Sequence, residues 1–282
     1  MIISIIGLGL IGGSLARRLR GFRNAEVYGV DINESTLKTA MSDGVIAKSF
    51  TKADEAAMVS DLIILCMYPE KNVEFIKSNA HLFKKGAVIT DVSGVKEYIL
   101  SSIEGVLPEG VEFVGGHPMA GREVGGYMNS TDTLFNKASY LITPTASNSP
   151  EAIELVRSMA EYIGCARVVT TTPKEHDAMI AYTSQLMHVV AIALCDNPLL
   201  ERSGNFSAGS LRDCTRVANI NAEMWSELFL ENSTALSERI EEMCQSLYRL
   251  KDAIDKNDRT SLFKMLENGA KRKQKWLSET MM

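Results

Sequence analysis

The residues of this chain with chemical potential gather in short segments that directly follow apolar runs. Gly7, Gly9 and Gly12 lie in the segment GLGLIG, between the run IISII and an amphipathic stretch. In such a segment the first glycine permits a tight turn, the second lets a pyrophosphate approach the backbone, and the third allows helix and strand to pack closely. The start of the following helix also offers unpaired N–H groups to an anion. We therefore predict a dinucleotide-binding loop formed by Gly7, Leu8, Gly9, Leu10, Ile11 and Gly12.

An acidic residue stands where such a loop needs one. Asp31 lies 19 residues beyond Gly12, at the end of an apolar run at 26–30. A carboxylate there accepts hydrogen bonds from the adenosine ribose hydroxyls and repels a 2′-phosphate. The segment that continues from it, DINEST, contains no Arg or Lys. The sequence therefore predicts NAD rather than NADP as the cofactor.

Two further segments follow apolar runs and carry polar side chains. The first is DVSGVK at 91–96, and the second begins at Gly116 and places His117 before Pro118. A histidine held between glycine and proline at a strand end suits a proton acceptor for an alcohol undergoing oxidation. A plain surface histidine is the alternative interpretation.

The elements that must position these residues change in character along the chain. Apolar, β-branched runs predict strands at 2–6, 26–30, 62–67, 87–92, 111–115, 139–143 and 167–170, and amphipathic spacing predicts helices at 11–20, 70–83 and 150–162. This alternation is typical of a parallel sheet covered by helices. After Pro173 only long helices are expected, at about 174–196, 222–254 and 259–277.

We therefore predict an α/β Rossmann-type dinucleotide-binding domain at 1–171 and an all-α domain at 172–282 that serves dimerisation, and to which the family resemblance described below also assigns substrate binding. The helices either cover each other within one chain or also pack across a two-fold axis, and we favour the homodimer. The basic run near Trp276 is interpreted as a solvated helix face.

Composition excludes several classes of protein. The 282 residues carry a net charge of −5, which gives no general attraction to nucleic acid or an anionic membrane. The five cysteines form no CxxC motif and the four histidines no HxxxH pair, so neither disulfides nor a metal site is predicted. The first 16 residues are uncharged, but Arg17 and Arg18 follow rather than precede them, unlike in a secretory signal. A cytoplasmic protein is expected.

Seven segments together carry a resemblance to a known family. They are GLGLIGGSLA, DVSGVK, HPMAG, EHD at 175–177, TSQLMH at 183–188, LRDCTRVA at 211–218 and MWSELFLEN at 224–232. In this order, over nearly the whole chain, they resemble the prephenate dehydrogenase family of tyrosine biosynthesis. The resemblance implies a dimer with its active site between a Rossmann and a helical domain. It also implies NAD-dependent oxidative decarboxylation of prephenate, driven forward by aromatisation of the ring.

The resemblance implies roles for individual residues. His117 matches the histidine that takes the proton of the ring hydroxyl, and Arg216 matches the arginine that binds a substrate carboxylate. Glu123 and Asp213 match acidic residues around that arginine, with a surface ion pair as the alternative. His188 matches a histidine near the substrate, and a buried core histidine is the alternative. The substrate role is favoured because His188 lies on one side of its helix in line with small or polar residues.

The chain departs from the family pattern at two positions. Many relatives have Gly then Ser in the second segment, whereas this chain has Ser93 then Gly94. Ser93 is a candidate catalytic residue that would reach the site from a shifted backbone. The alternative is that a water molecule takes the place of the serine hydroxyl. Gln185 stands where many relatives have a histidine. No fused mutase or regulatory module is expected, while inhibition by tyrosine at the active site stays open.

Other functions remain as alternatives. Arogenate dehydrogenase, or a dual-specificity cyclohexadienyl dehydrogenase, performs the same chemistry on a substrate that carries an added ammonium. A β-hydroxyacid or imine-reducing dehydrogenase would be expected to carry a lysine inside the helix at 174–196, which has one only at Lys174. A catalytically silent NAD-binding sensor would need no proton acceptor such as His117.

Overall fold

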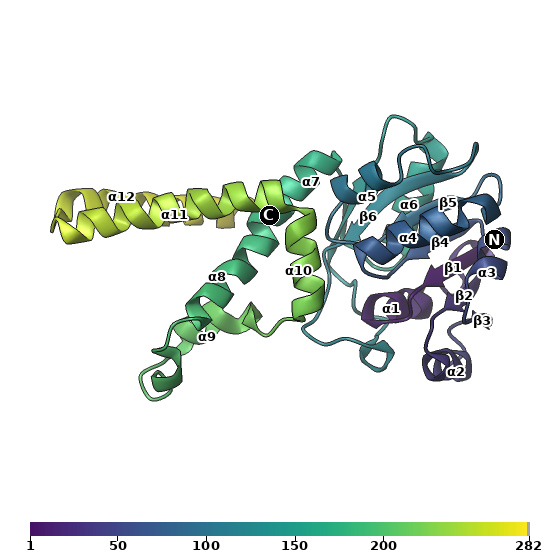
Figure 1. The fold of residues 1–282 in the computed structure, drawn as a ribbon, viewed down its shortest axis with the longest axis horizontal. Coiled ribbons are helices and arrows are strands. Elements are labelled where there is room, and N and C mark those ends of the chain that lie inside the picture. Colours follow the sequence, from purple (N-terminus) through teal and green to yellow (C-terminus); the bar gives the residue numbers. More distant parts are fainter. Residues whose placement is uncertain (281–282) are drawn as a thin grey trace. The chain divides into compact units, whose positions relative to one another are not determined.

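A single mixed sheet organises the first part of the chain. The structure is a computed structural model that describes residues 1–280. Its strands are β1 (Ile2–Ile6), β2 (Glu26–Val30), β3 (Lys48–Phe50), β4 (Leu62–Leu65), β5 (Val88–Asp91), β6 (Glu112–Pro118), β7 (Ser139–Thr143) and β8 (Arg167–Thr170). They lie in the order β3-β2-β1-β4-β5-β6-β7-β8. Figure 1 labels the strands β1 to β6 of this sheet. All neighbours are parallel except β6 and β7, which are antiparallel.

Helices bury both faces of this sheet. One core contains side chains of α1 (Leu10–Leu19), α2 (Glu34–Ser42) and α6 (Pro150–Tyr162), and the other contains side chains of α3 (Asp54–Val59), α4 (Pro69–Asn79) and α5 (Glu97–Ser102). Along β4, Leu62 and Ile64 join the first core, while Ile63 and Leu65 join the second. Two-sided burial explains why the central strands read as continuous apolar runs rather than alternating ones. The predicted α/β architecture is confirmed.

Local sequence sets where several helices begin. The Asn33 side chain accepts hydrogen bonds from Ser35 N and Thr36 N at the start of α2. Ser149 caps α6, and Thr172 caps α7 (Pro173–Ile180), each directly before a proline at the first helical position. Capping oxygens satisfy backbone N–H groups that have no partner within the helix, and proline there loses no hydrogen bond.

The helical part begins at Pro173 as predicted, although its first long helix is not regular. α7 passes through a π-helical turn at Ala181–Gln185 into α8 (Leu186–Cys195). α9 (Gly209–Thr215) and α10 (Ala222–Glu231) follow. By length and composition alone the stretch Pro173–Cys195 could cross a membrane, with a mean hydropathy of 1.6 in its most apolar window, but apolar helices of soluble proteins pass the same test.

The predicted helix at 222–254 is two helices, because the chain breaks at Asn232. α11 (Ser233–Asp255) and α12 (Arg259–Thr280) form a helical hairpin whose connection places Asn257 at a φ of 52°. The chain forms two compact units, Met1–Ser233 and the residues from Thr234 onward. A domain boundary after residue 171 therefore stays a prediction.

Candidate functional site

The glycine loop has the geometry that its sequence predicts. Gly7 has a φ of 94°, in the region that favours glycine, and its N–H donates to Val30 O at 2.8 Å. A Cβ on Gly12 would lie 1.9 Å from Gly7 O, so only glycine lets α1 approach the loop this closely. A Cβ on Gly9 would meet nothing within 4 Å. The loop therefore leaves open space at the N-terminus of α1, where a pyrophosphate needs to approach.

Asp31 is fixed against the same loop. Its Oδ2 accepts Leu8 N at 2.8 Å and its Oδ1 accepts Asn33 N at 2.8 Å. Each carboxylate oxygen has a second acceptor position left for a ribose hydroxyl. The next residue, Ile32, is 93% exposed. The glycine loop and the carboxylate together fit a dinucleotide.

His117 lies inside β6, near its carboxyl end, rather than in the loop after a strand ending at 115. The longer strand is possible because its glycines let neighbouring strands and side chains approach. A Cβ on Gly115 would lie 2.2 Å from Thr143 Oγ1, and one on Gly116 would lie 2.3 Å from Tyr140 Oη. Pairing with β7 then holds the backbone of His117, which is a more rigid support than a loop.

The His117 ring belongs to a hydrogen-bonded line of side chains. His117 Nδ1 lies 2.9 Å from His176 Nε2, and His176 Nδ1 lies 2.7 Å from Asp177 Oδ1. Burial, followed by the electrostatic influence of the neighbouring His176 and Lys96, holds the pKa of His117 well below its usual value of 6.5. The ring is consequently neutral near pH 7 and able to accept a proton.

A buried ion pair lies within the segment at 91–96, next to β6. Lys96 Nζ lies 2.5 Å from Asp91 Oδ2, and both side chains are fully buried. The other oxygen of Asp91 accepts Gly116 N at 3.1 Å, one residue before His117. Lys96 Nζ also donates to Ser93 O at 2.8 Å. The ion pair thus fixes the conformation of the segment at 91–96, and the hydrogen bond from Gly116 N to Asp91 ties this segment to β6.

Ser93 is buried in that segment but faces another partner. Its Oγ accepts Asn72 Nδ2 at 3.0 Å, and within residues 1–280 the structure gives it no hydrogen bond to His117. Gly94 is the closer neighbour, because a Cβ there would lie 3.9 Å from His117 Cε1. The structure thus does not bring the Ser93 hydroxyl to the His117 ring, and a catalytic role for Ser93 stays a prediction.

Arg216 and Glu123 do come together. Arg216 lies in a 3-10 turn at Arg216–Ala218, and its Nη1 lies 2.5 Å from Glu123 Oε1. The Arg216 side chain is 65% exposed, which leaves further N–H groups free to bind a carboxylate. Asp213 lies three residues earlier on α9 and is exposed, and no ion pair between it and Arg216 occurs in the described residues.

His188 lies beside the Arg216 turn. Its Nδ1 donates to Val217 O at 2.8 Å, and its ring lies 3.7 Å from the Trp225 ring, centroid to centroid. Burial lowers the pKa of His188, with Arg216 adding to the effect and the Val217 hydrogen bond opposing it. Gln185 lies one turn earlier, and both polar atoms of its amide have partners within the protein. Its Nε2 donates to Leu228 O at 3.0 Å, and its Oε1 accepts from Asn232 Nδ2 at 2.7 Å.

Sequence reasoning assigned no individual role to His176, Asp177, Lys96 or Asp91, which lie around His117 in the structure. The available signal was their place in the segments EHD and DVSGVK. In isolation, however, each is a charged or polar residue at an ordinary position, and only the fold brings the two segments together.

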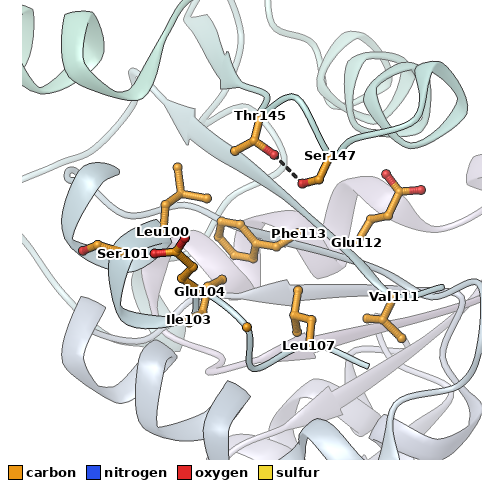
Figure 2. Close-up of a pocket in the computed structure, with 11 residues that line it drawn as sticks. Leu100, Ser101, Ile103, Glu104, Leu107, Val111, Glu112, Phe113, Thr145 and Ser147 are labelled. Atoms are coloured by element: carbon orange, nitrogen blue, oxygen red, sulfur yellow. Dashed lines mark hydrogen bonds between the residues drawn. The ribbon is translucent and has the colours of Figure 1, made fainter. Parts of the chain in front are cut away.

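A separate pocket of about 540 Å³ lies at the opposite end of β6 (Figure 2). It is lined by Leu100, Ser101, Ile103, Glu104, Gly105, Leu107, Val111, Glu112, Phe113, Thr145 and Ser147. Because β6 begins at Glu112, this pocket is at the amino end of the strand and holds none of the predicted site residues. In residues 1–280 no group of three or more His, Cys, Asp or Glu side chains is arranged to hold a metal ion.

Comparison with known proteins finds matches over both parts of the chain. Residues 15–170 match the family described as prephenate dehydrogenase, nucleotide-binding domain, and residues 172–268 match prephenate dehydrogenase, dimerization domain. Prephenate dehydrogenase of Bacillus subtilis is 30% identical over 93% of this chain and 72% of its own length.

Solved structures agree over nearly the full length. Prephenate dehydrogenase from A. aeolicus, in complex with hydroxyphenyl propionate and NAD+, superposes with a TM-score of 0.88 at 30% identity and covers 98% of each chain. Synechocystis arogenate dehydrogenase superposes with a TM-score of 0.85 at 28% identity, covering 98% of this chain and 100% of its own. With both of its parts matched and the glycine loop, His117 and Arg216 in place, this chain belongs to the prephenate dehydrogenase family.

Proposed function

We propose that this protein oxidises and decarboxylates prephenate to 4-hydroxyphenylpyruvate, with NAD as the hydride acceptor, in tyrosine biosynthesis. The observation that carries the proposal is the position of the His117 ring, held near the carboxyl end of β6 by a buried hydrogen-bonded line to His176 and Asp177. Ligands of open α/β sheets bind at the carboxyl ends of the strands. A proton acceptor at this position suits the oxidation of a ring alcohol.

The cofactor would be held by the glycine loop at 7–12 and by Asp31. When bound, NAD supplies the acceptor for the hydride that leaves the ring carbon bearing the hydroxyl. Asp31 would accept the adenosine ribose hydroxyls, and its negative charge would repel a 2′-phosphate. The preference for NAD over NADP rests on this carboxylate.

The substrate would be held from the helical side. The exposed N–H groups of Arg216 would bind a carboxylate of prephenate, with Glu123 orienting the guanidinium. His188 would line the same region, because its Nδ1 donates a hydrogen bond to Val217 O, next to Arg216. A role for Asp213 would require that its side chain approach Arg216.

The reaction then needs one proton acceptor from the protein. His117 would take the proton of the ring hydroxyl as the carbon–oxygen bond gains carbonyl character. The hydride leaves the same ring carbon, and CO2 leaves the opposite carbon with its bonding electrons remaining in the ring. Aromatisation of the product makes the reaction irreversible.

Arogenate is the second candidate substrate. The carboxylate of Glu123 lies beside Arg216 and offers a partner for the ammonium group that arogenate carries and prephenate lacks. Synechocystis arogenate dehydrogenase also resembles this chain over nearly its whole length.

We also propose a homodimer located in the cytoplasm. Support for the dimer comes from the match of residues 172–268 to a dimerisation domain and from exposed apolar side chains on α8, among them Met187, Ile192 and Leu194. Support for the location comes from the apolar N-terminal stretch, which forms the buried strand β1 and the start of α1.

The test is steady-state formation of NADH, followed by its absorbance, with purified protein and either prephenate or arogenate, repeated with NADP. We expect turnover with prephenate and NAD, and the ratio of kcat/KM values for the two substrates identifies the preferred one. Absence of turnover with both substrates, in a protein that binds NAD, would refute the proposal.

A further inference from the structure

His176 and Asp177 extend the site beyond the residue that meets the substrate. His176 is 1% exposed and stands between His117 and Asp177, at 2.9 Å from the first and 2.7 Å from the second. Asp177 is itself fixed, since Lys96 N donates to its Oδ1 and Glu97 N to its Oδ2, both at 2.9 Å. The carboxylate thus caps α5 while it faces the ring of His176.

Hydrogen-bond accounting determines where the protons lie. Both oxygens of Asp177 accept a backbone N–H, as suits an ionised carboxylate, which can only accept hydrogen bonds. His176 Nδ1 must therefore be the donor to Asp177 Oδ1, since two lone pairs would otherwise face each other across 2.7 Å. A neutral imidazole carries one N–H, so His176 Nε2 is left as an acceptor.

The same reasoning then fixes the ring of His117. Only His117 Nδ1 can supply the hydrogen that the contact with His176 Nε2 needs, so it carries the proton. His117 Nε2 is consequently bare. Burial lowers the pKa of His176, despite the opposing hydrogen bond from Asp177, which agrees with a neutral ring in this line.

We infer that His176, oriented by Asp177, is a positioning residue that holds His117 in its Nδ1–H tautomer and so leaves Nε2 free to accept the substrate proton. The inference rests on the proposed function for its consequence in catalysis, but the tautomer itself does not depend on the substrate. Which nitrogen of a histidine is protonated is set by the hydrogen bond that the other nitrogen makes. Without His176, the proton of His117 would be distributed over both ring nitrogens.

The direct test is the tautomer, read by two-dimensional long-range ¹⁵N–¹H spectra of the full-length protein labelled at histidine. The chain has four histidines, which are assigned by single substitutions. We expect a bare Nε2 on His117 in the unsubstituted protein. In His176→Asn the shorter amide can still donate to Asp177 but does not reach His117, and we expect Nε2 of His117 to become partly protonated. His81→Asn, at an exposed position, is the matched control.

The result that overturns the inference is a protonated Nε2 on His117 in the unsubstituted protein, or a tautomer that does not change in His176→Asn. The spectrum of the unsubstituted protein decides the first point even where the variant fails to fold. His176→Gln provides a second variant, because its side-chain oxygen can still accept from His117 Nδ1, and it should retain the bare Nε2.

Kinetics with prephenate and NAD separate this inference from the proposed function. We expect His176→Asn to lower kcat at least about tenfold while KM changes little, since removing the group that orients a catalytic histidine acts on turnover. His176→Gln should recover part of the loss. No turnover by the unsubstituted protein would refute the proposed function and leave the tautomer test intact. Normal kcat in His176→Asn, beside an active unsubstituted protein, would overturn the inference.

Discussion

Alanine substitutions at two glycines of the cofactor loop, Gly9 and Gly12, should have opposite effects on stability and on NAD binding. Gly9 has φ and ψ of −77° and −153°, and a Cβ on it would meet nothing within 4 Å. Gly9→Ala should therefore fold with an unchanged melting temperature. Its methyl group would occupy the space that a pyrophosphate needs, however, and would weaken the hydrogen bonds from the start of α1 to the phosphate oxygens.

The size of the effect follows from those hydrogen bonds. Losing one hydrogen bond to a charged group costs about 1.5–3 kcal/mol. This corresponds to an increase of roughly 10- to 150-fold in the Kd for NAD, since each 1.4 kcal/mol is about tenfold. Titration calorimetry with NAD measures this change directly.

Gly12→Ala is the matched contrast. Its Cβ would lie 1.9 Å from Gly7 O, so α1 and the loop would have to separate. Overpacking of this kind costs about 1–3 kcal/mol or more, a fall in melting temperature of at least about 2 °C in a protein of this size. The reasoning is refuted if Gly9→Ala binds NAD as tightly as the unsubstituted protein, or if Gly12→Ala melts without NAD at the same temperature.

Three further predictions test other parts of the site and fold. Asp31→Ala should weaken NAD and improve NADP relative to it, because the carboxylate that repels a 2′-phosphate is lost; an unchanged ratio of kcat/KM for the two cofactors contradicts this. Arg216→Ala should raise KM for prephenate by roughly 10- to 150-fold, from about 1.5–3 kcal/mol for a lost charge-assisted bond, and an unchanged KM means that the carboxylate is held elsewhere. Burial, followed by Glu227 and Glu70, raises the pKa of Glu231 from 4.5 to about 8, so the folded protein binds more protons than the unfolded chain between these values and loses stability as pH rises through them. Glu231→Gln should therefore gain melting temperature over the unsubstituted protein as pH rises from about 5 to about 9, whereas the exposed Glu223→Gln on the same helix should not, and equal pH dependence of the two variants would disprove the shift.

The sequence predicted most strands because apolar, β-branched runs mark them, even at the largely exposed edge strand β8. The runs at 2–6, 26–30, 139–143 and 167–170 coincide with β1, β2, β7 and β8. The strand β3 was missed because Lys48–Phe50 is a short edge strand with two exposed residues. α3 and α5 were missed since six residues are too few to show a helical period.

The site was predictable only where local spacing carries the chemistry. The glycine loop and Asp31 are separated by a fixed sequence distance, so the sequence specifies both. The contact between His117 and His176, by contrast, joins residues 59 positions apart, and it depends on how α7 packs against the segment at 91–96. The partner of Ser93 could not be predicted either, because it depends on the position of Asn72 on α4.

The most direct test of the proposed function compares His117→Asn with the unsubstituted protein in NADH formation from prephenate and NAD. We expect the unsubstituted protein to turn over, and we expect the variant to keep a similar KM while its kcat falls by about 10²–10⁴-fold, the usual effect of a positioned base. A variant with near-normal kcat would contradict the assignment of His117 as the proton acceptor.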